Sequence, residues 1–184
     1  AAIKARMAYR GDFFMSFFIM LVSEIVGPII VFLIYQSGAS FPGWTLYEML
    51  LLQSMYLLAI GLTFPFFFGM VWNTIYRVEK GTFDILLLKP RSVLHMAIAT
   101  GFDSEDLGKL AGGLIFFTIA MANLPSPSLT QVLTFLALII LMLSVLFSFA
   151  LFMSGTGFVW LGGWRIYEIF HSIVSFGMYP KSIY

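Results

Sequence analysis

Four long apolar runs dominate this chain, and they constrain its fold more than any other feature. The runs are Phe13–Tyr35, Met49–Trp72, Leu110–Leu124 and the first part of Leu129–Trp164. An α-helix rises about 1.5 Å per residue, so runs of this length cross, or nearly cross, a hydrocarbon core of about 30 Å. Glu24 is the one charged residue inside them. The runs therefore predict an integral membrane protein.

Composition supports the same class of protein. Hydrophobic residues make up 60% and charged residues 10% of the 184 residues, whereas an ordinary globular domain has about 25% charged residues. We predict an all-α fold, a polytopic transmembrane helical bundle, with residues 1–184 forming a single domain. The expected spans lie at about 13–35, 49–71, 107–124 and 129–154. A bundle this small usually needs partners. The net charge of +1 gives no indication of nucleic-acid binding, and the absence of cysteine excludes disulfides and thiol chemistry.

The positive charges predict the orientation of the bundle. If the four runs span the membrane, all Lys and Arg residues fall on one side: Lys4, Arg6, Arg10, Arg77, Lys80, Lys89, Arg91, Lys109, Arg165 and Lys181. The two opposite connections, 36–47 and 125–128, contain neither residue type. Positively charged loops stay in the cytoplasm, so we predict that both termini are cytoplasmic.

Glycine and proline residues predict where two of the helices end or bend. The uncharged run Leu129–Trp164 would measure about 54 Å as a straight helix, so it is expected to break, and its glycines, Gly155, Gly157, Gly162 and Gly163, mark the place. Beyond them, apolar residues recur at helical spacing opposite polar ones, which predicts an interfacial amphipathic helix at about 164–178. Pro65 is expected to bend the second helix or end it early.

The cytoplasmic loop at about 72–92 is the least generic segment of the chain. Gly81 is suited to end one short helix, Thr82 or Asp84 to start the next, and Pro90 to stop it. The segment therefore predicts two small amphipathic cytoplasmic helices. Phe83 and the leucines 86–88 are unusual in a loop that only meets water. They indicate docking, either onto the bilayer surface or into the groove of a cytoplasmic partner.

This loop carries a resemblance to a known family. Its pattern is Arg77-x-x-Lys80-Gly81-x-Phe83-Asp84-x-Leu86-Leu87-Leu88-Lys89-Pro90. The pattern, with Trp44–Leu50 before it and Tyr179–Tyr184 after it, resembles the membrane (permease) subunits of bacterial type-2 ABC exporters, the ABC-2 type transporter family.

The resemblance implies a multi-pass permease of the bacterial cytoplasmic (inner, plasma) membrane that has six spans. It also implies pairing with a second permease copy or a paralogue, and with ATP-binding subunits that hold the ATP and Mg²⁺, so that this chain has no cofactor of its own. The loop is then the coupling element, and its expected ATPase-interface residues are Arg77, Lys80, Gly81, Phe83, Asp84, Leu86, Leu87, Lys89 and Pro90. Such permeases continue into two more spans after the position of Tyr184, so the sequence is expected to be truncated there or to belong to a degenerate paralogue.

Polar residues inside the spans offer a second candidate site. Glu24 is costly in lipid, at least about 2.5 kcal/mol, so it is expected to face protein or water. It could contribute, with Gln53, to a substrate pathway, or it could be a protonated or paired residue that ties the first span to Gln53 and Ser54.

The chain is not expected to be an enzyme. It has no Walker motif, and His95 and His171 are too isolated for a metal pair. Ser154-Gly-Thr-Gly157 fits a helix break better than a hydrolase turn. A transport permease is the leading interpretation, and a non-transporting membrane scaffold or accessory subunit is the alternative. A membrane enzyme acting on lipids is disfavoured, because the spans lack clustered His, Asp or Glu.

Overall fold

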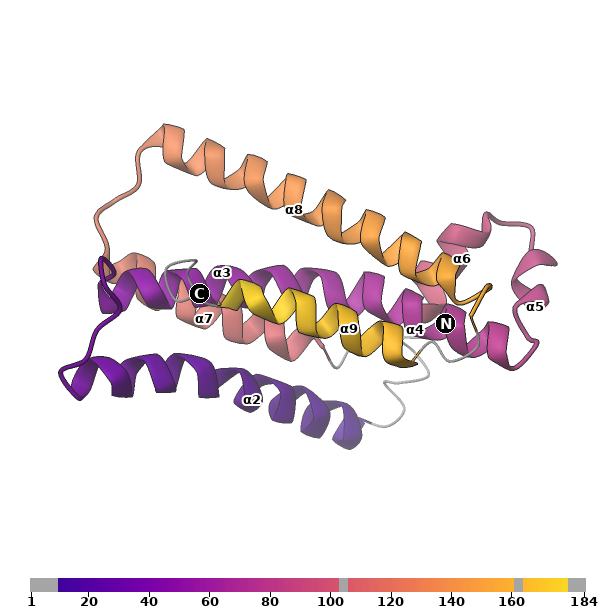
Figure 1. Ribbon diagram of the computed structural model, residues 1–184, viewed down its shortest axis with the longest axis horizontal. Coiled ribbons are helices and arrows are strands. Elements are labelled where there is room, and N and C mark those ends of the chain that lie inside the picture. Colours follow the sequence, from indigo (N-terminus) through magenta and orange to yellow (C-terminus); the bar gives the residue numbers. More distant parts are fainter. Residues whose placement is uncertain (1–9, 103–105, 161–163, 179–184) are drawn as a thin grey trace.

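The computed structural model describes residues 10–102, 106–160 and 164–178, and this part of the chain is helical without any strand. The all-α prediction is therefore confirmed. The elements in chain order are α2 (Arg10–Gln36), α3 (Leu46–Thr63), η2 (Phe64–Phe68), α4 (Gly69–Glu79), α5 (Asp84–Leu87), α6 (Val93–Gly101), α7 (Leu107–Asn123), α8 (Leu129–Thr156), α9 (Trp164–Ser175) and η3 (Phe176–Met178). The long helices share one general direction, and the short helices α5 and α6 gather at one end (Figure 1).

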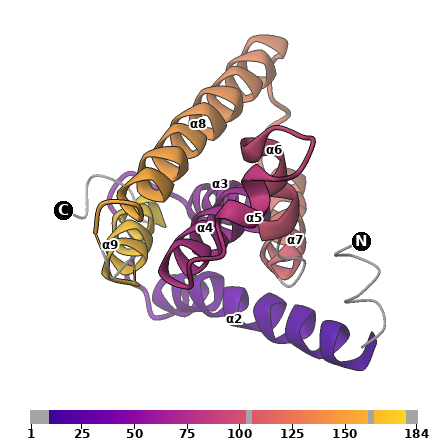
Figure 2. The same cartoon turned by 90° about the vertical axis from the view of Figure 1, so that its right-hand side faces the viewer.

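Three of the described helices are long and apolar enough to cross a membrane. They are Gly11–Gln36, Leu46–Glu79 and Leu129–Thr156. The third predicted span corresponds to α7, which is apolar but has 17 residues, about 26 Å of helix. α7 makes the most extensive helix contact of the bundle, along α3, and it also packs on α2. The chain is therefore a polytopic bundle with α3 at its centre (Figure 2).

Glycines let the central helices approach closely. A Cβ atom on Gly61 of α3 would lie 2.5 Å from the backbone N and Cα of Leu110 on α7. A Cβ atom on Gly108 of α7 would lie 2.5 Å from the carbonyl oxygen of Phe17 on α2. Small residues at such contacts are the usual means by which membrane helices gain close packing, because lipid supplies no hydrophobic force between them. α2, α3 and α7 therefore form a tight three-helix unit.

Pro65 does not end the second helix. It lies in η2, a π-helical turn that connects α3 to α4, so that Leu46–Glu79 is one span of 34 residues. A π turn accommodates the carbonyl that a proline leaves without its usual partner. The rings of Phe64 and Phe68 stack across this turn at 4.0 Å, and the Lys109 ammonium lies 4.2 Å from the Phe64 ring centre. The expected early end at Pro65 is thus not observed.

The long helix of the fourth run ends at the first two of the predicted glycine breaks. α8 ends at Thr156 and is capped by Gly157, at the expected break, whereas Gly162 and Gly163 lie outside the described residues. α9, predicted as an interfacial helix, runs back alongside the bundle (Figures 1 and 2). Val174 packs on the core cluster of α3, and a Cβ atom on Gly177 would lie 3.6 Å from the ring of Tyr56. Ile169 and Ile173 on the same helix are 56% and 53% exposed, so the placement of 164–178 on the membrane surface stays a prediction.

The two ends of the bundle carry different kinds of connection. The segments between α2 and α3 and between α7 and α8 lie at one end, and α5 and α6 lie at the other (Figure 1).

We expect cysteine introduced at Ser40, which is exposed in the segment between α2 and α3, to react with a membrane-impermeant maleimide in intact cells. Cysteine at Lys89, exposed at the opposite end, should react only after the cells are opened. The reverse pattern would invert the predicted orientation.

Candidate coupling surface and intramembrane cleft

The coupling segment, residues 77–91, begins with a tight helix end. Gly81 adopts φ +64°, in the left-handed region that glycine enters without strain. The Thr82 N–H donates to the Arg77 carbonyl at 2.8 Å and the Gly81 N–H donates to the Val78 carbonyl at 3.1 Å. These two bonds form a Schellman motif, which ends α4 and turns the chain towards α5.

Two predicted interface residues hold α5 against the rest of the protein. Leu86 is 1% exposed, so its side chain is fully packed within this chain. The Phe83 ring meets the Phe158 ring, just beyond α8, edge to face at 4.8 Å. Both side chains are therefore engaged internally, and they are not on the surface that a partner would meet first.

The surface of the coupling segment is formed by their neighbours. Ile85, Leu87 and Leu88, here called the coupling face, are 52%, 56% and 85% exposed. The predicted interface residues include Leu87 but omit Ile85 and Leu88. Asp84, Lys89 and Pro90 are exposed beside them, as is Arg91. The coupling segment thus exposes three large apolar side chains on and beside α5, with charged groups next to them.

The side chain of Arg77 is hydrogen-bonded within the chain and is not free at the edge of the coupling face. Its Nε donates to the Asn73 Oδ1 at 3.0 Å, and the Asn73 Nδ2 donates to the Thr100 Oγ1 at 2.9 Å. This chain of hydrogen bonds joins α4 to α6. Lys80, by contrast, is exposed, and its ammonium lies 5.9 Å from the Tyr76 ring centre.

We expect Asn73→Ala to lower the free energy of unfolding by about 1–2 kcal/mol, because it removes the bridge between α4 and α6. Thermal unfolding of the purified protein in detergent measures this effect. The control is Asn123→Ala, since Asn123 is exposed and donates only within its own helix, to the Ile119 carbonyl. Equal unfolding temperatures for the two variants would show that the bridge contributes nothing.

The intramembrane candidates meet at a cleft between α2 and α3. Its volume is about 270 Å³, and its lining residues are Ser23, Glu24, Val26, Gly27, Pro28, Ile30, Gln53, Tyr56 and Leu57. Glu24 also approaches α7, because its Cβ lies 3.6 Å from the place of a Cβ on Gly112. Glu24 therefore faces protein and the cleft.

The alternative in which Glu24 pairs with Gln53 or Ser54 finds no support in the hydrogen bonds of these two residues. Gln53 is 2% exposed, and neither its Nε2 nor its Oε1 has a hydrogen-bond partner. The Ser54 hydroxyl donates to the Leu51 carbonyl at 2.7 Å, within its own helix. Gln53 and Glu24 thus line the same cleft, but no hydrogen bond joins the Gln53 amide to Glu24.

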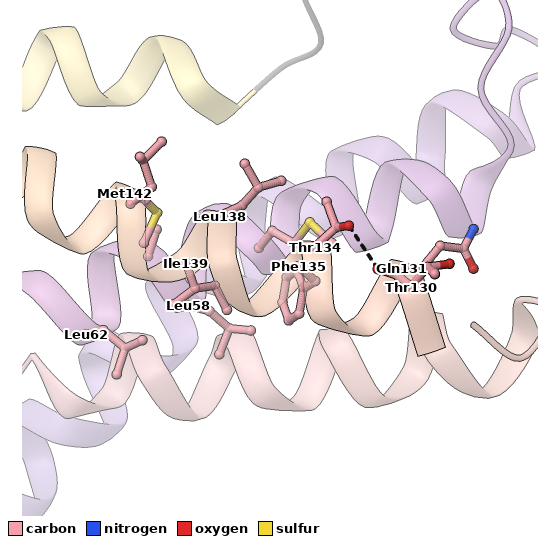
Figure 3. A pocket seen from close by; sticks show the side chains of 12 residues that line it. Leu58, Leu62, Thr130, Gln131, Thr134, Phe135, Leu138, Ile139 and Met142 are labelled. Atoms are coloured by element: carbon pink, nitrogen blue, oxygen red, sulfur yellow. Dashed lines mark hydrogen bonds between the residues drawn. The ribbon is translucent and has the colours of Figure 1, made fainter. Parts of the chain in front are cut away.

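A larger cavity of about 640 Å³ lies between α3 and α8 (Figure 3). Most of its lining is aliphatic, from residues such as Leu58 and Ile139. The few hydroxyl groups gather at the start of α8, where the Thr134 hydroxyl donates to the Thr130 carbonyl at 2.8 Å. In contrast to the cleft at Gln53, this cavity contains no buried polar atom that lacks a partner among the residues described.

Comparison with known families decides the class of this bundle. The family model described as ABC-2 family transporter protein matches residues 18–184, nearly the whole chain. This chain belongs to the ABC-2 transporter family. Comparison with curated proteins and with solved structures gave no match. The ABC-2 permease is thus a multi-pass membrane component of a transport system, a class that is generally not catalytic itself.

Two further polar groups of the ABC-2 permease have partners within the chain. The Lys109 ammonium pairs with the Asp106 carboxylate at 2.7 Å, where α7 begins. The Ser154 hydroxyl donates to the Ala150 carbonyl at 2.9 Å, a bond within α8. Across the described ranges, no three His, Cys, Asp or Glu side chains come together as a metal site.

Proposed function

We propose that this permease couples ATP hydrolysis in partner subunits to movement of a substrate across the membrane. In this proposal, the ATP-binding subunit docks on the coupling face, and a second permease copy or a paralogue completes the substrate pathway. The observation that carries the proposal is the exposure of Ile85, Leu87 and Leu88 on a short helix that the protein itself holds in place.

The position of the coupling face favours a protein partner over the bilayer. The span Leu46–Glu79 has 34 residues, about 51 Å of helix, which exceeds a hydrocarbon core of about 30 Å. α4 therefore extends beyond the membrane if α3 begins at the opposite surface, and α5 lies past its end. An exposed apolar patch in that position is typical of a docking site. Lys89 and Arg91 at its edge suit the polar rim of an interface, which directs orientation more than affinity.

The contacts of α5 provide a route for coupling. Leu86 packs inside the protein, and Phe83 contacts Phe158 beyond the end of α8. Asn73 and Thr100 join α4 to α6. A movement of the coupling face would therefore displace the ends of α4, α6 and α8 together. In this way, closure of the ATP-binding subunits around ATP would move several helices as a unit.

The second permease would cover apolar helix surfaces. Large apolar side chains of α2 and α8 are exposed along their length, including Phe18 at 63% and Ile140 at 66%.

The direct test of the proposed function is affinity purification of the tagged chain from its native membrane, followed by identification of its partners. We expect an ATP-binding subunit in the complex, whereas an accessory scaffold would purify without one.

A further inference from the structure

Gln53 is held in an unfavourable state by the structure. It lies on α3, is 2% exposed, and keeps both polar atoms of its amide without a partner at the cleft between α2 and α3. A buried polar group without a hydrogen bond is destabilising. The cleft beside it measures about 270 Å³, slightly less than the cavities of about 300–1,000 Å³ that hold drug-sized ligands. The space is therefore sufficient for a small polar group.

The side chains of Gln53 and Glu24 determine which kind of chemical group could bind in the cleft. The amide of Gln53 needs an acceptor at its Nε2 and a donor at its Oε1. A hydroxyl provides both, whereas an ammonium group would pair with Glu24 and donate to the Oε1 but would leave the Nε2 without an acceptor. An anionic group would serve the Nε2 alone and would meet the carboxyl group of Glu24, which lines the same cleft near the middle of α2. Several neighbouring hydroxyls would satisfy Gln53 and Glu24 together.

We propose that the cleft between α2 and α3 binds an uncharged, hydroxyl-rich group of about the size of a sugar ring, held by Gln53 and Glu24. This inference rests on the proposed transport function, because it assigns the cleft to the substrate pathway. The group belongs either to the headgroup of a glycolipid or to a free sugar. The middle of the bundle is apolar, so a polar cleft there serves a polar group that passes through the membrane.

The test measures ligand retention by native mass spectrometry on the full chain purified in detergent. The probes are a glucosyl dioleoylglycerol, the dioleoyl lipids with trimethylammonium or phosphate in place of the sugar, and free methyl glucoside. We expect the wild type to retain the glucosyl lipid, or methyl glucoside if the free sugar is the source, above both charged lipids. Gln53→Leu should lower this retention about tenfold, because it removes two hydrogen bonds.

A second measurement separates binding from a structural role. Gln53→Leu should raise the unfolding temperature while it lowers retention, because leucine buries no unpaired polar atoms. The matched control, Gln36→Leu at the exposed end of α2, should leave retention unchanged. Preference for a charged lipid, equal retention by wild type and Gln53→Leu, or a lower unfolding temperature in Gln53→Leu would overturn the proposal. Because no ATP-binding subunit takes part, such a failure leaves the test of the proposed function independent.

Discussion

Leu88→Asp should separate the ATP-binding subunit from the permease and leave the helical bundle intact. Leu88 is 85% exposed, so the folded chain alone tolerates a carboxylate there. In the proposed interface the same carboxylate would be buried without a partner, which costs about 2–4 kcal/mol and lowers affinity by about 30- to 1,000-fold. The measurement is the amount of ATP-binding subunit that purifies with wild type and variant at equal membrane expression. Leu87→Asp should act in the same direction.

Two control variants make the result specific. Leu129→Asp places the same charge on a side chain that is 75% exposed at the start of α8, at the other end of the bundle, and it should retain the partner. Leu86→Asp introduces a carboxylate at a side chain that is 1% exposed, so it should lower the unfolding temperature itself. If Leu88→Asp purifies with as much ATP-binding subunit as Leu129→Asp does, the coupling face is misassigned.

Gly61→Val should destabilise the bundle more than any surface substitution. Its Cβ would lie 2.5 Å from the backbone N and Cα of Leu110, atoms that cannot move aside by a change of rotamer. The helices α3 and α7 would have to separate along their extensive contact. Such overpacking typically costs about 1–3 kcal/mol, and we expect at least the upper end of this range. Thermal unfolding in detergent and the yield of folded protein both report the loss.

The control for this prediction is the same substitution at an open position. Gly155 lies in α8 and has no atom within 4 Å of the place its Cβ would take. Gly155→Val should therefore leave the unfolding temperature nearly unchanged or raise it slightly, because valine has a higher helix propensity than glycine. An equal effect at both sites would show that the contact between α3 and α7 does not depend on Gly61.

The helices of this protein are predictable because lipid imposes a simple requirement. A spanning segment must satisfy its own backbone and must be apolar over its length, so the long apolar runs mark α2, α3 and α8 directly. The glycines after Ser154 likewise predict the end of α8 near Thr156. α9 shows the limit of periodicity. Its apolar side indicates burial against something, but spacing alone does not distinguish a membrane surface from the side of α3.

The sequence indicated which segments hold the candidate sites, but it was less able to identify which residues within them are exposed or unpaired. Leucines 86–88 are chemically identical, and the helical turn at α5 decides that Leu86 points inward while Leu87 and Leu88 are exposed. The sequence offered two roles for Gln53, in a substrate pathway with Glu24 or as a possible pairing partner of Glu24, and it did not decide between them. The lack of a partner for the Gln53 amide depends on the spacing of α2 and α3, which no local pattern in the sequence encodes.

The most direct test of the account is photocrosslinking from the coupling face in native membranes. A photoreactive amino acid in place of Leu88, the most exposed residue of that face, should form a covalent product with an ATP-binding subunit on irradiation. The same probe in place of Leu133, which is 57% exposed on α8, should form no such product. Crosslinks from position 88 to lipid alone, or to a protein without an ATP-binding site, would contradict the proposed coupling.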